Sequence, residues 1–396
     1  MAYGINERGK RVVTSQHKSA ESASRLSLLM GFLESDPENL NLIGDAANAA
    51  LDESVLDKVG ELVSRYRSLA EVPPSLINVE GITLMRQGHL DEAAAIFSSL
   101  HASGHDNPSL RFNLAWVGAL QQHHEDVLAW LDDEVVATIP RAAALKVQTL
   151  HHLNRIEDAI AAGQELAELY PNDNYLLGAL SVAAMDADDF ELARHFAMRA
   201  DGGADALTTQ GLISLSNDAP EAAAMLFERA LTEHPDAPRA WLGRGLSLLA
   251  QGDADSAALC LDKGAEIFGD HLGSWIASGW THFIRKDLDA ARKSFETALS
   301  HDDNFAETHG ALAVLDLAEG KAESARKRTD IALRLDKECF GGVLARTLLL
   351  ELDGKPELAA NIRERAMNMP ISIDGKTLAQ AMIGLGMNGS MGRDKT

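Results

Sequence analysis

Apolar residues recur at helical spacing along the chain and are interrupted by short polar turns. In residues 241–268, WLGRGLSLLAQG is followed by DADSAALCLDKGAEIF, and both halves place apolar residues three or four positions apart. This spacing predicts two amphipathic helices joined by a tight turn. Such a pair cannot bury its apolar face alone, so it must pack against neighbouring pairs.

The predicted pair repeats with a period of 34 residues. Ala223, Ala257, Ala291, Ala325 and Ala359 occupy one position, each at the end of a similar polar turn. A fixed period of this length predicts a stacked array of helix pairs. Small residues are expected where the paired helices cross, and the large residues Phe97, Phe227, Leu261 and Phe295 are expected to fill the space between successive pairs. The alanine position continues upstream at Ala193, Ala159, Val127 and Ala93.

Residues 206–235 and 274–303 carry the strongest family signal. Of all the units, these two best match a pattern of an aromatic, a Leu-Gly pair, an aromatic, then Ala, Phe, Ala and Pro. The chain thereby resembles the tetratricopeptide repeat family, in a bacterial-type multi-repeat form. This resemblance implies an all-α fold, a right-handed superhelix of about nine to ten helix pairs. Residues 113–126 lack the Leu-Gly pair, and Thr329 and Arg363 replace the Phe in the last two units.

The phase of the repeat divides the chain into segments. We expect a disordered arm over 1–19, and a capping helix with a degenerate repeat over 20–73, in which Leu56 fills the alanine position. Residues 374–396 are expected to form a second capping helix and a disordered tail. The nine regular units are predicted at 74–107, 108–139, 140–173, 174–203, 204–237, 238–271, 272–305, 306–339 and 340–373.

The composition agrees with a helical repeat array, and the net charge restricts the class of partner that the protein can bind. The 396 residues include 36 basic and 59 acidic side chains, for a formal net charge of −23. This charge opposes contact with phosphate, so no nucleic-acid binding is expected. No apolar stretch approaches 18 residues, and the first residues have no apolar core segment, so we expect no membrane insertion, no signal peptide and a cytoplasmic protein. Cys260 and Cys339 lie on different repeats, which argues against a disulfide.

The sequence shows no motif typical of a catalytic site. The chain has no glycine-rich phosphate loop, no H-E-x-x-H and no C-x-x-C. Histidine pairs stand at 123–124 and 151–152, but adjacent helical residues point about 100° apart, so each pair offers at most one ligand to a site. We therefore predict a protein that is not an enzyme and that uses no cofactor and no metal.

Function in this family resides on the concave surface, which is lined by the first helix of each pair. The corresponding positions here are mostly apolar. A carboxylate clamp of the co-chaperone type would need Lys or Arg at its inward positions, which here hold Asn78, Phe112, Ala144, Gly178, Thr208 and Leu242. The predicted partner-binding residues are Ile82, Met85, Phe112, Trp116, Gln148, His151, Met185, Leu212, Leu246, Ile276, Trp280 and Phe283.

The resulting hypothesis is a non-catalytic scaffold or adaptor that binds a protein or peptide partner in an apolar groove. Trp116, Trp280 and Phe283 are the expected anchors, because large aromatic side chains dominate binding energy at interfaces. Two alternatives stay open: a secretion or assembly chaperone for a hydrophobic client, and a substrate-recognition partner of a separate enzyme such as a glycosyltransferase. The identity of the partner and the oligomeric state are also open at this stage.

Overall fold

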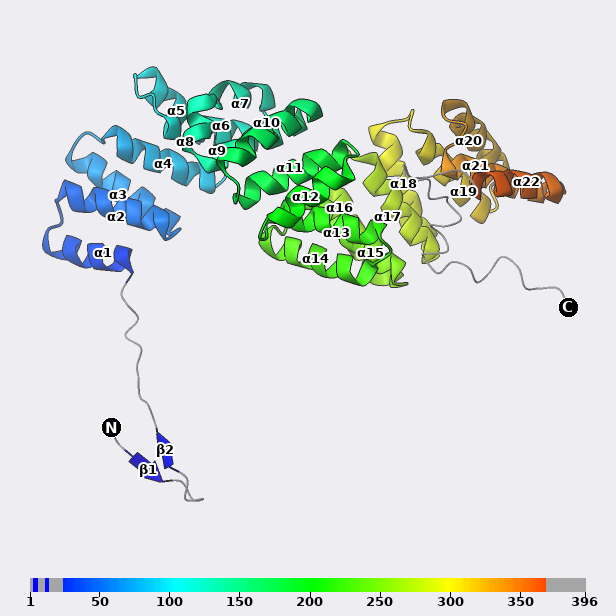
Figure 1. Ribbon diagram of the computed structural model, residues 1–396, viewed down its shortest axis with the longest axis horizontal. Helices are drawn as coiled ribbons and strands as arrows, with labels where there is room; N and C mark the ends of the chain where they lie inside the picture. Colours follow the sequence, from blue (N-terminus) through cyan, green and yellow to red (C-terminus); the bar gives the residue numbers. More distant parts are fainter. Residues whose placement is uncertain (1–2, 6–10, 14–23, 368–396) are drawn as a thin grey trace. The chain divides into compact units, whose positions relative to one another are not determined.

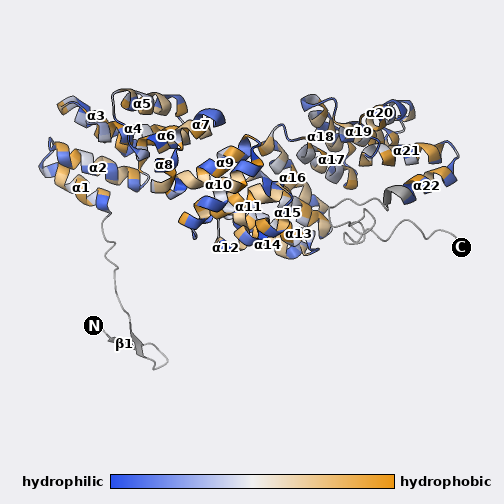
Figure 2. Cartoon of the chain, turned by 45° about the horizontal axis from the view of Figure 1, so that its top comes forward, coloured by the Kyte–Doolittle hydropathy of each residue, from blue (hydrophilic) through white to orange (hydrophobic). Residues whose placement is uncertain are grey.

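The computed structural model describes residues 3–5, 11–13 and 24–367 (Figure 1). The described residues form 22 helices and one short two-stranded ladder, so the predicted all-α class is confirmed. The chain divides into two compact units, Met1–Ile139 and Pro140–Thr396, and each is a stack of antiparallel-type helix pairs joined by short turns. Figure 2 shows hydrophobic and hydrophilic residues on the same helices, as amphipathic packing requires.

The ladder lies near the N-terminus, inside the segment for which the sequence predicted a disordered arm. β1 (Tyr3–Ile5) pairs antiparallel with β2 (Arg11–Val13), with Tyr3 opposite Val13 and Ile5 opposite Arg11. The remainder of that arm lies outside the described residues, as does the predicted C-terminal capping helix at 375–385. The expected capping helix before the first pair is present as α1 (Arg25–Ser35), which begins at the N-cap Ser24.

The first unit continues from α1 through seven further helices. They are α2 (Leu40–Asp52), α3 (Leu56–Leu69), α4 (Pro74–Arg86), α5 (Leu90–Ala102), α6 (Pro108–Leu120), α7 (His124–Trp130) and α8 (Asp133–Thr138). The second helix expected in 108–139 is therefore broken into α7 and α8. The break has a local cause, because the Asp132 side chain accepts a hydrogen bond from the Val135 N–H at 2.9 Å and so starts a new helix.

The second unit contains seven helix pairs in sequence order. They are α9 (Pro140–His152) with α10 (Ile156–Leu169), α11 (Asn174–Asp186) with α12 (Phe190–Arg199), α13 (Ala204–Ser216) with α14 (Pro220–Glu233), α15 (Pro238–Ala250) with α16 (Ala254–Phe268), α17 (Leu272–Ile284) with α18 (Leu288–His301), α19 (Ala306–Ala318) with α20 (Ala322–Leu335), and α21 (Phe340–Leu352) with α22 (Pro356–Met367).

One backbone feature marks the turn inside every pair. The residue two or so positions after the first helix has a positive φ, the left-handed conformation that a helix commonly uses to end. Glycine fits this conformation best, because a Cβ is penalised there. The turn residues are Ser54, Gly88, Gln122, Asn154, Asp188, Asp218, Gly252, Lys286, Gly320 and Gly354, with φ between 56° and 84°.

This turn corrects one assignment in the degenerate repeat. Ala93 lies five residues after the turn residue Gly88, and the same offset from Ser54 leads to Val59. Val59 is fully buried, like Ala93, whereas Leu56 is only half-buried. Val59, and not Leu56, therefore occupies the alanine position. Leu56 instead begins α3 and packs, half-buried, against the core that contains Val59.

In several pairs a glycine of the first helix faces a large side chain of the second. A Cβ placed on Gly279 would lie 2.3 Å from the Phe295 ring, and one on Gly211 would lie 2.7 Å from Phe227. Both Phe side chains are fully buried. Small residues at the helix crossings, with large buried side chains beside them, are thus confirmed at these two pairs. Each glycine leaves room for an aromatic ring of the second helix.

Candidate interaction surface

All twelve predicted partner-binding residues lie on the first helices of their pairs. They are divided between the two units. Four belong to the first unit and eight to the second. The first set is Ile82 and Met85 on α4 with Phe112 and Trp116 on α6, and the second is Gln148 and His151 on α9, Met185 on α11, Leu212 on α13, Leu246 on α15, and Ile276, Trp280 and Phe283 on α17.

In the first unit the aromatic pair of α6 stands out. The Phe112 and Trp116 rings lie one helical turn apart, with centroids 5.5 Å from each other and planes tilted by 51°. Both side chains are half-buried. Ile82 and Met85 are also half-buried and pack against the core that contains Phe97. These four residues combine an internal packing role with partial access to solvent.

The predicted apolar lining is interrupted by a polar network at the start of the second unit. His151 Nε2 lies 2.7 Å from Asp186 Oδ2, and Gln148 donates to Asp205 Oδ2 at 3.3 Å. Arg239 donates to both oxygens of Asp186, at 2.8 and 2.5 Å. Gln148 and His151 are therefore engaged within the fold. They join α9, α11, α13 and α15, which is a different role from the predicted partner contact.

Asp186 is the centre of this network and is not among the predicted site residues, because it stands in an acidic run over 186–189 of the kind that commonly starts a helix. It is the last residue of α11, and only Asp189 of that acidic run caps the next helix, by accepting from Leu192 N–H at 3.0 Å. Burial would raise the pKa of Asp186, but hydrogen bonds from His151 and Arg239 hold that pKa well below its usual value. Asp186 thus stays ionised in the folded protein. The neighbouring Met185 is half-buried.

The three aliphatic candidates differ in their exposure. Leu246 is 38% exposed, whereas Leu212 is half-buried against the core that contains Phe227. Ile276 is only 8% exposed and belongs to the core that contains Phe295. The prediction that Ile276 lines an open surface is therefore wrong, because its side chain turns into the pair. Leu246 remains accessible to a partner.

The other two candidates on α17 belong to a continuous apolar surface. Trp280 and Phe283 pack with residues of two further first helices, α19 and α21, around Val314 and Ala345. Half-buried side chains from all three helices contribute to it. The α17–α19–α21 surface is defined by Trp280, Phe283, Leu317, Leu344 and Leu348.

Trp280 anchors this surface through three ring contacts. Its ring centroid lies 5.6 Å from Phe283, 5.5 Å from Phe295 and 5.8 Å from Phe340, all in edge-to-face geometry. Phe295 is buried and Phe340 is 45% exposed. The indole therefore connects the core of its own pair with a surface that solvent reaches.

Sequence reasoning missed the part of this surface that lies on α21. Leu348 stands 34 residues after Val314 and 68 after Trp280, so the period itself contained the signal. In the last two units Thr329 and Arg363 replace the expected Phe. Those substitutions lie on α20 and α22, the second helices, and leave the first helix free to present Leu344 and Leu348.

Close backbone contact holds α19 and α21 together beneath this surface. A Cβ on Gly310 would lie 2.3 Å from the Gly342 nitrogen, so no larger residue fits at this crossing. Glu307 accepts hydrogen bonds from the Gly341 N–H at 3.0 and 3.1 Å and from the Trp280 side chain. Burial raises the pKa of Glu307 despite these bonds. The carboxylate links the N-terminus of α21 to the indole.

Comparison with known proteins identifies the repeat. Residues 208–271 match the family model described as tetratricopeptide repeat, and this range covers α13 to α16. The chain contains tetratricopeptide repeats in this range. A search of curated protein sequences found no match.

Solved structures of other repeat proteins resemble this one at low identity. A monomeric mutant of IFIT1 with m7Gppp-AAAA has a TM-score of 0.52 at 13% identity, covering 86% of this chain and 94% of that one. The human IFIT1 dimer with m7Gppp-AAAA has a TM-score of 0.49 at 11% identity, with the same coverage. The Cut9-Hcn1 hetero-tetramer has a TM-score of 0.47 at 10% identity, covering 82% and 86%. At 13% identity, the likeness to the monomeric IFIT1 mutant shows a similar fold and nothing more.

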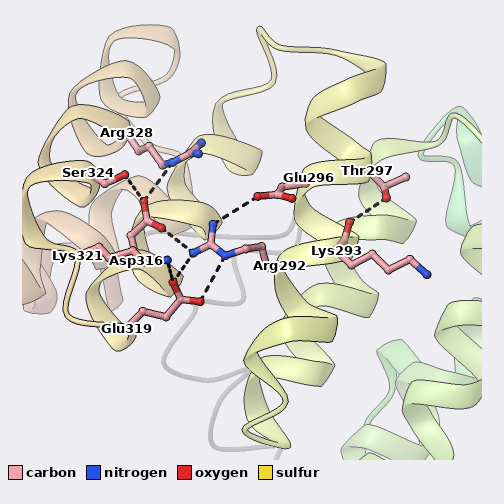
Figure 3. A network of polar contacts seen from close by, with 9 residues as sticks. All are labelled: Arg292, Lys293, Glu296, Thr297, Asp316, Glu319, Lys321, Ser324 and Arg328. Carbon is pink, nitrogen blue, oxygen red and sulfur yellow. Dashed lines mark hydrogen bonds and ion pairs between the residues drawn. The ribbon is translucent and has the colours of Figure 1, made fainter.

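A charged network connects the α17–α18 pair with the α19–α20 pair (Figure 3). Arg292 of α18 donates to Asp316 Oδ1 and to Glu319 Oε2, both at 2.7 Å. Asp316, at the end of α19, also accepts from Ser324 Oγ at 2.6 Å and lies 3.2 Å from Arg328 Nε. The Asp316 side chain is only 2% exposed. Arg328 of α20 thus contacts a buried carboxylate.

The repeats offer little that suggests catalysis in the part of the chain that the structure describes. Burial raises the pKa of Cys339 to about 11 and raises that of Cys260, so neither thiol is an activated nucleophile. No group of three or more His, Cys, Asp or Glu among the described residues is placed to hold a metal ion. No helix there is long and apolar enough to cross a bilayer. The arrangement is that of a protein-interaction scaffold in general terms.

Proposed function

We propose that this tetratricopeptide-repeat protein is a non-catalytic scaffold that binds a segment of a partner protein on the α17–α19–α21 surface. The observation that carries the proposal is the packing of Trp280, Phe283, Leu317, Leu344 and Leu348 against one buried cluster, which contains Val314 and Ala345. Three first helices thus contribute half-buried apolar side chains to one surface. Burial of such a surface by a partner releases water from apolar groups and stabilises the complex.

The chemistry of the surface favours a polypeptide with apolar side chains. Trp280 is held by three aromatic neighbours, so little side-chain freedom is lost when a partner contacts it. None of the five residues that define the surface is charged. An amphipathic helix or an extended segment could place apolar side chains against it, while polar residues on its other face stay in water.

The likeness to IFIT1 with m7Gppp-AAAA raises a nucleic-acid alternative for this chain. The chain's formal net charge of −23 opposes the approach of phosphate, and none of the five side chains that define the α17–α19–α21 surface is basic. Sequence identity with the IFIT1 structures is 13% or below for the two described above. The proposal therefore commits to a protein partner.

Site-specific photo-crosslinking tests the location of the contact. A benzophenone amino acid is placed at Leu317 on α19 in one variant and at Leu259 on α16 in the other. Leu259 is 74% exposed, so it controls for crosslinking to any exposed apolar position. We expect a distinct protein adduct in native lysate from position 317 and not from position 259. Adducts from position 259 alone would overturn the proposal, and adducts with nucleic acid would overturn the choice of a protein partner.

A further inference from the structure

The first unit contains a cavity that the proposed function does not use. It lies between α3 and α4, which belong to successive pairs, and has a volume of about 290 Å³. This volume is at the lower end of the range for ligand sites, so it suits one side chain better than a whole cofactor. Its lining combines an apolar part, with Leu56, Val59 and Leu84, and an acidic part, with Asp57, Glu61 and Glu80.

The acidic part of the lining is only partly neutralised. Glu61 forms an ion pair with Lys58, and Glu80 forms one with Arg67 at 2.7 Å. Asp57 forms no ion pair with any other described residue and is exposed at the edge of the cavity. Three carboxylates therefore face two cations, and one negative charge remains to be balanced.

The surrounding helices and the unit as a whole favour a cation in the same place. Gln87, which ends α4, lines the cavity, and the C-terminal end of a helix carries a partial negative charge. Residues 24–139 contain 18 acidic and 6 basic side chains, for a formal net charge of −12. A field of this sign draws positively charged groups toward the unit.

A glycine keeps the cavity open. Gly60 stands in the middle of α3, lines the cavity, and is exposed. A Cβ placed there would have no other atom within 4 Å, so neither close packing nor a positive φ explains the glycine. Glycine inside a helix destabilises it relative to alanine. Any long side chain at this position would reach into the space that the cavity occupies.

From these features we infer that the cavity between α3 and α4 receives the side chain of a lysine or arginine from a basic segment of a partner polypeptide. The long aliphatic part of such a side chain suits the apolar lining, and its charged end suits Asp57, Glu61 and Glu80. The carboxylates are not grouped to hold a metal ion. The inference goes beyond the proposed function, because it concerns the first unit and leaves the α17–α19–α21 surface out.

The experiment uses the full-length protein and a synthetic probe. A capped peptide of alternating alanine and arginine is titrated while amide resonances of Gly60 and Thr83 are followed by NMR. An identical peptide with citrulline in place of arginine keeps the shape and removes the charge. We expect shifts at both residues with the arginine peptide, weakened as salt rises from about 0.05 to about 0.5 M because screening shortens the reach of the charges, and much smaller shifts with citrulline.

Two variants separate the cavity from the general acidity of the unit. Gly60→Leu adds a side chain at the cavity, its Cβ would have no other atom within 4 Å, and leucine is the better helix former, so the variant should fold. Gly31→Leu, also at an open position but on α1 away from the cavity, is the matched control. We expect Gly60→Leu to abolish the shifts, Gly31→Leu to retain them, and Asp57→Asn to weaken binding about threefold. Equal binding by Gly60→Leu and the parent, or by both peptides, would overturn the inference.

Discussion

Arg239 and Asp186 are joined by two hydrogen bonds, of 2.8 and 2.5 Å, although 53 positions separate them in the sequence. Asp186 ends α11 and Arg239 begins α15, so the pair connects the first helices of repeats that are two apart. His151 of α9 contacts the same carboxylate. Bonds of this kind hold consecutive repeats at a fixed angle, which stacking against the nearest neighbour does not do alone.

Removal of the Asp186 charge should change acid stability in a defined window. The folded protein holds the pKa of Asp186 below its ordinary value of about 3.9, so its stabilising effect is complete above that pH and is lost as pH falls toward the lower folded-state pKa. Asp186→Asn cannot titrate. We expect it to cost about 2 kcal/mol at neutral pH and to lose less stability than the parent below about pH 4.

Urea unfolding followed by circular dichroism at neutral and acid pH measures both effects. Asp188→Asn is the control, since Asp188 is an exposed turn residue two positions away. The control should follow the parent at both pH values. Equal acid sensitivity of Asp186→Asn and the parent would contradict the role given to this carboxylate.

Lys286 offers a simple way to stabilise the array. Its φ is +63°, in a turn where Gly88, Gly252, Gly320 and Gly354 adopt the same conformation in other repeats. The left-handed conformation costs a residue with a Cβ roughly 1–2 kcal/mol, and glycine relieves this strain. The greater freedom of glycine in the unfolded chain offsets part of the stability gained. Lys286→Gly should therefore raise stability by about 0.5–1 kcal/mol in thermal unfolding. Lys286→Ala keeps the Cβ, so an equal gain there would show that charge and not backbone strain is responsible.

Asp316 should be the most sensitive charged position. Truncation by Asp316→Ala leaves Arg292 and Arg328 without their shared buried partner, and we expect a loss of about 3 kcal/mol in urea unfolding. Arg326→Ala breaks the more exposed pair with Asp353 and should cost less than about 1 kcal/mol. Similar losses for both variants would mean that the network in Figure 3 is no stronger than a surface ion pair.

Two glycines in helix interiors should respond to alanine with opposite sign. At Gly279 the new Cβ would lie 2.3 Å from the buried Phe295 ring, so Gly279→Ala should destabilise the protein by about 1–3 kcal/mol. At Gly44 of α2 the Cβ would meet nothing within 4 Å, so Gly44→Ala should stabilise it by about 0.5–1 kcal/mol. Thermal unfolding of both variants decides this. Two shifts of the same sign would show that the ring at Gly279 moves aside freely.

The periodic features of the fold could be predicted from the sequence because each is repeated in many units. Ala93, Ala223 and Ala291 are all fully buried, as their shared position requires. Local chemistry that occurs once was missed. Asp132 caps α8 and breaks a helix, and a single acidic residue in a polar turn gives no signal of that outcome beforehand.

The candidate surface was predictable only in part for a related reason. Trp280 and Phe283 were found as aromatic residues at inward positions, and Leu348 follows from the period once the unusual second helices are ignored. The network of Gln148, His151 and Asp186 was not found, because its bonds reach across two repeats and depend on the angle at which repeats stack. One-dimensional patterns contain no information on that angle. The burial of Ile276 likewise depends on how α17 is rotated about its own axis.

The central claim is that the α17–α19–α21 surface binds the partner, and the dissociation constant of the partner captured by crosslinking tests it most directly. One variant carries Leu317→Ser and Leu348→Ser; its control carries Met225→Ser and Leu259→Ser on α14 and α16, where the side chains are 67% and 74% exposed. With equal helicity in both, we expect binding at least about tenfold weaker in the first and unchanged in the second. Unchanged binding in the first variant, or a loss confined to the second, would contradict the account.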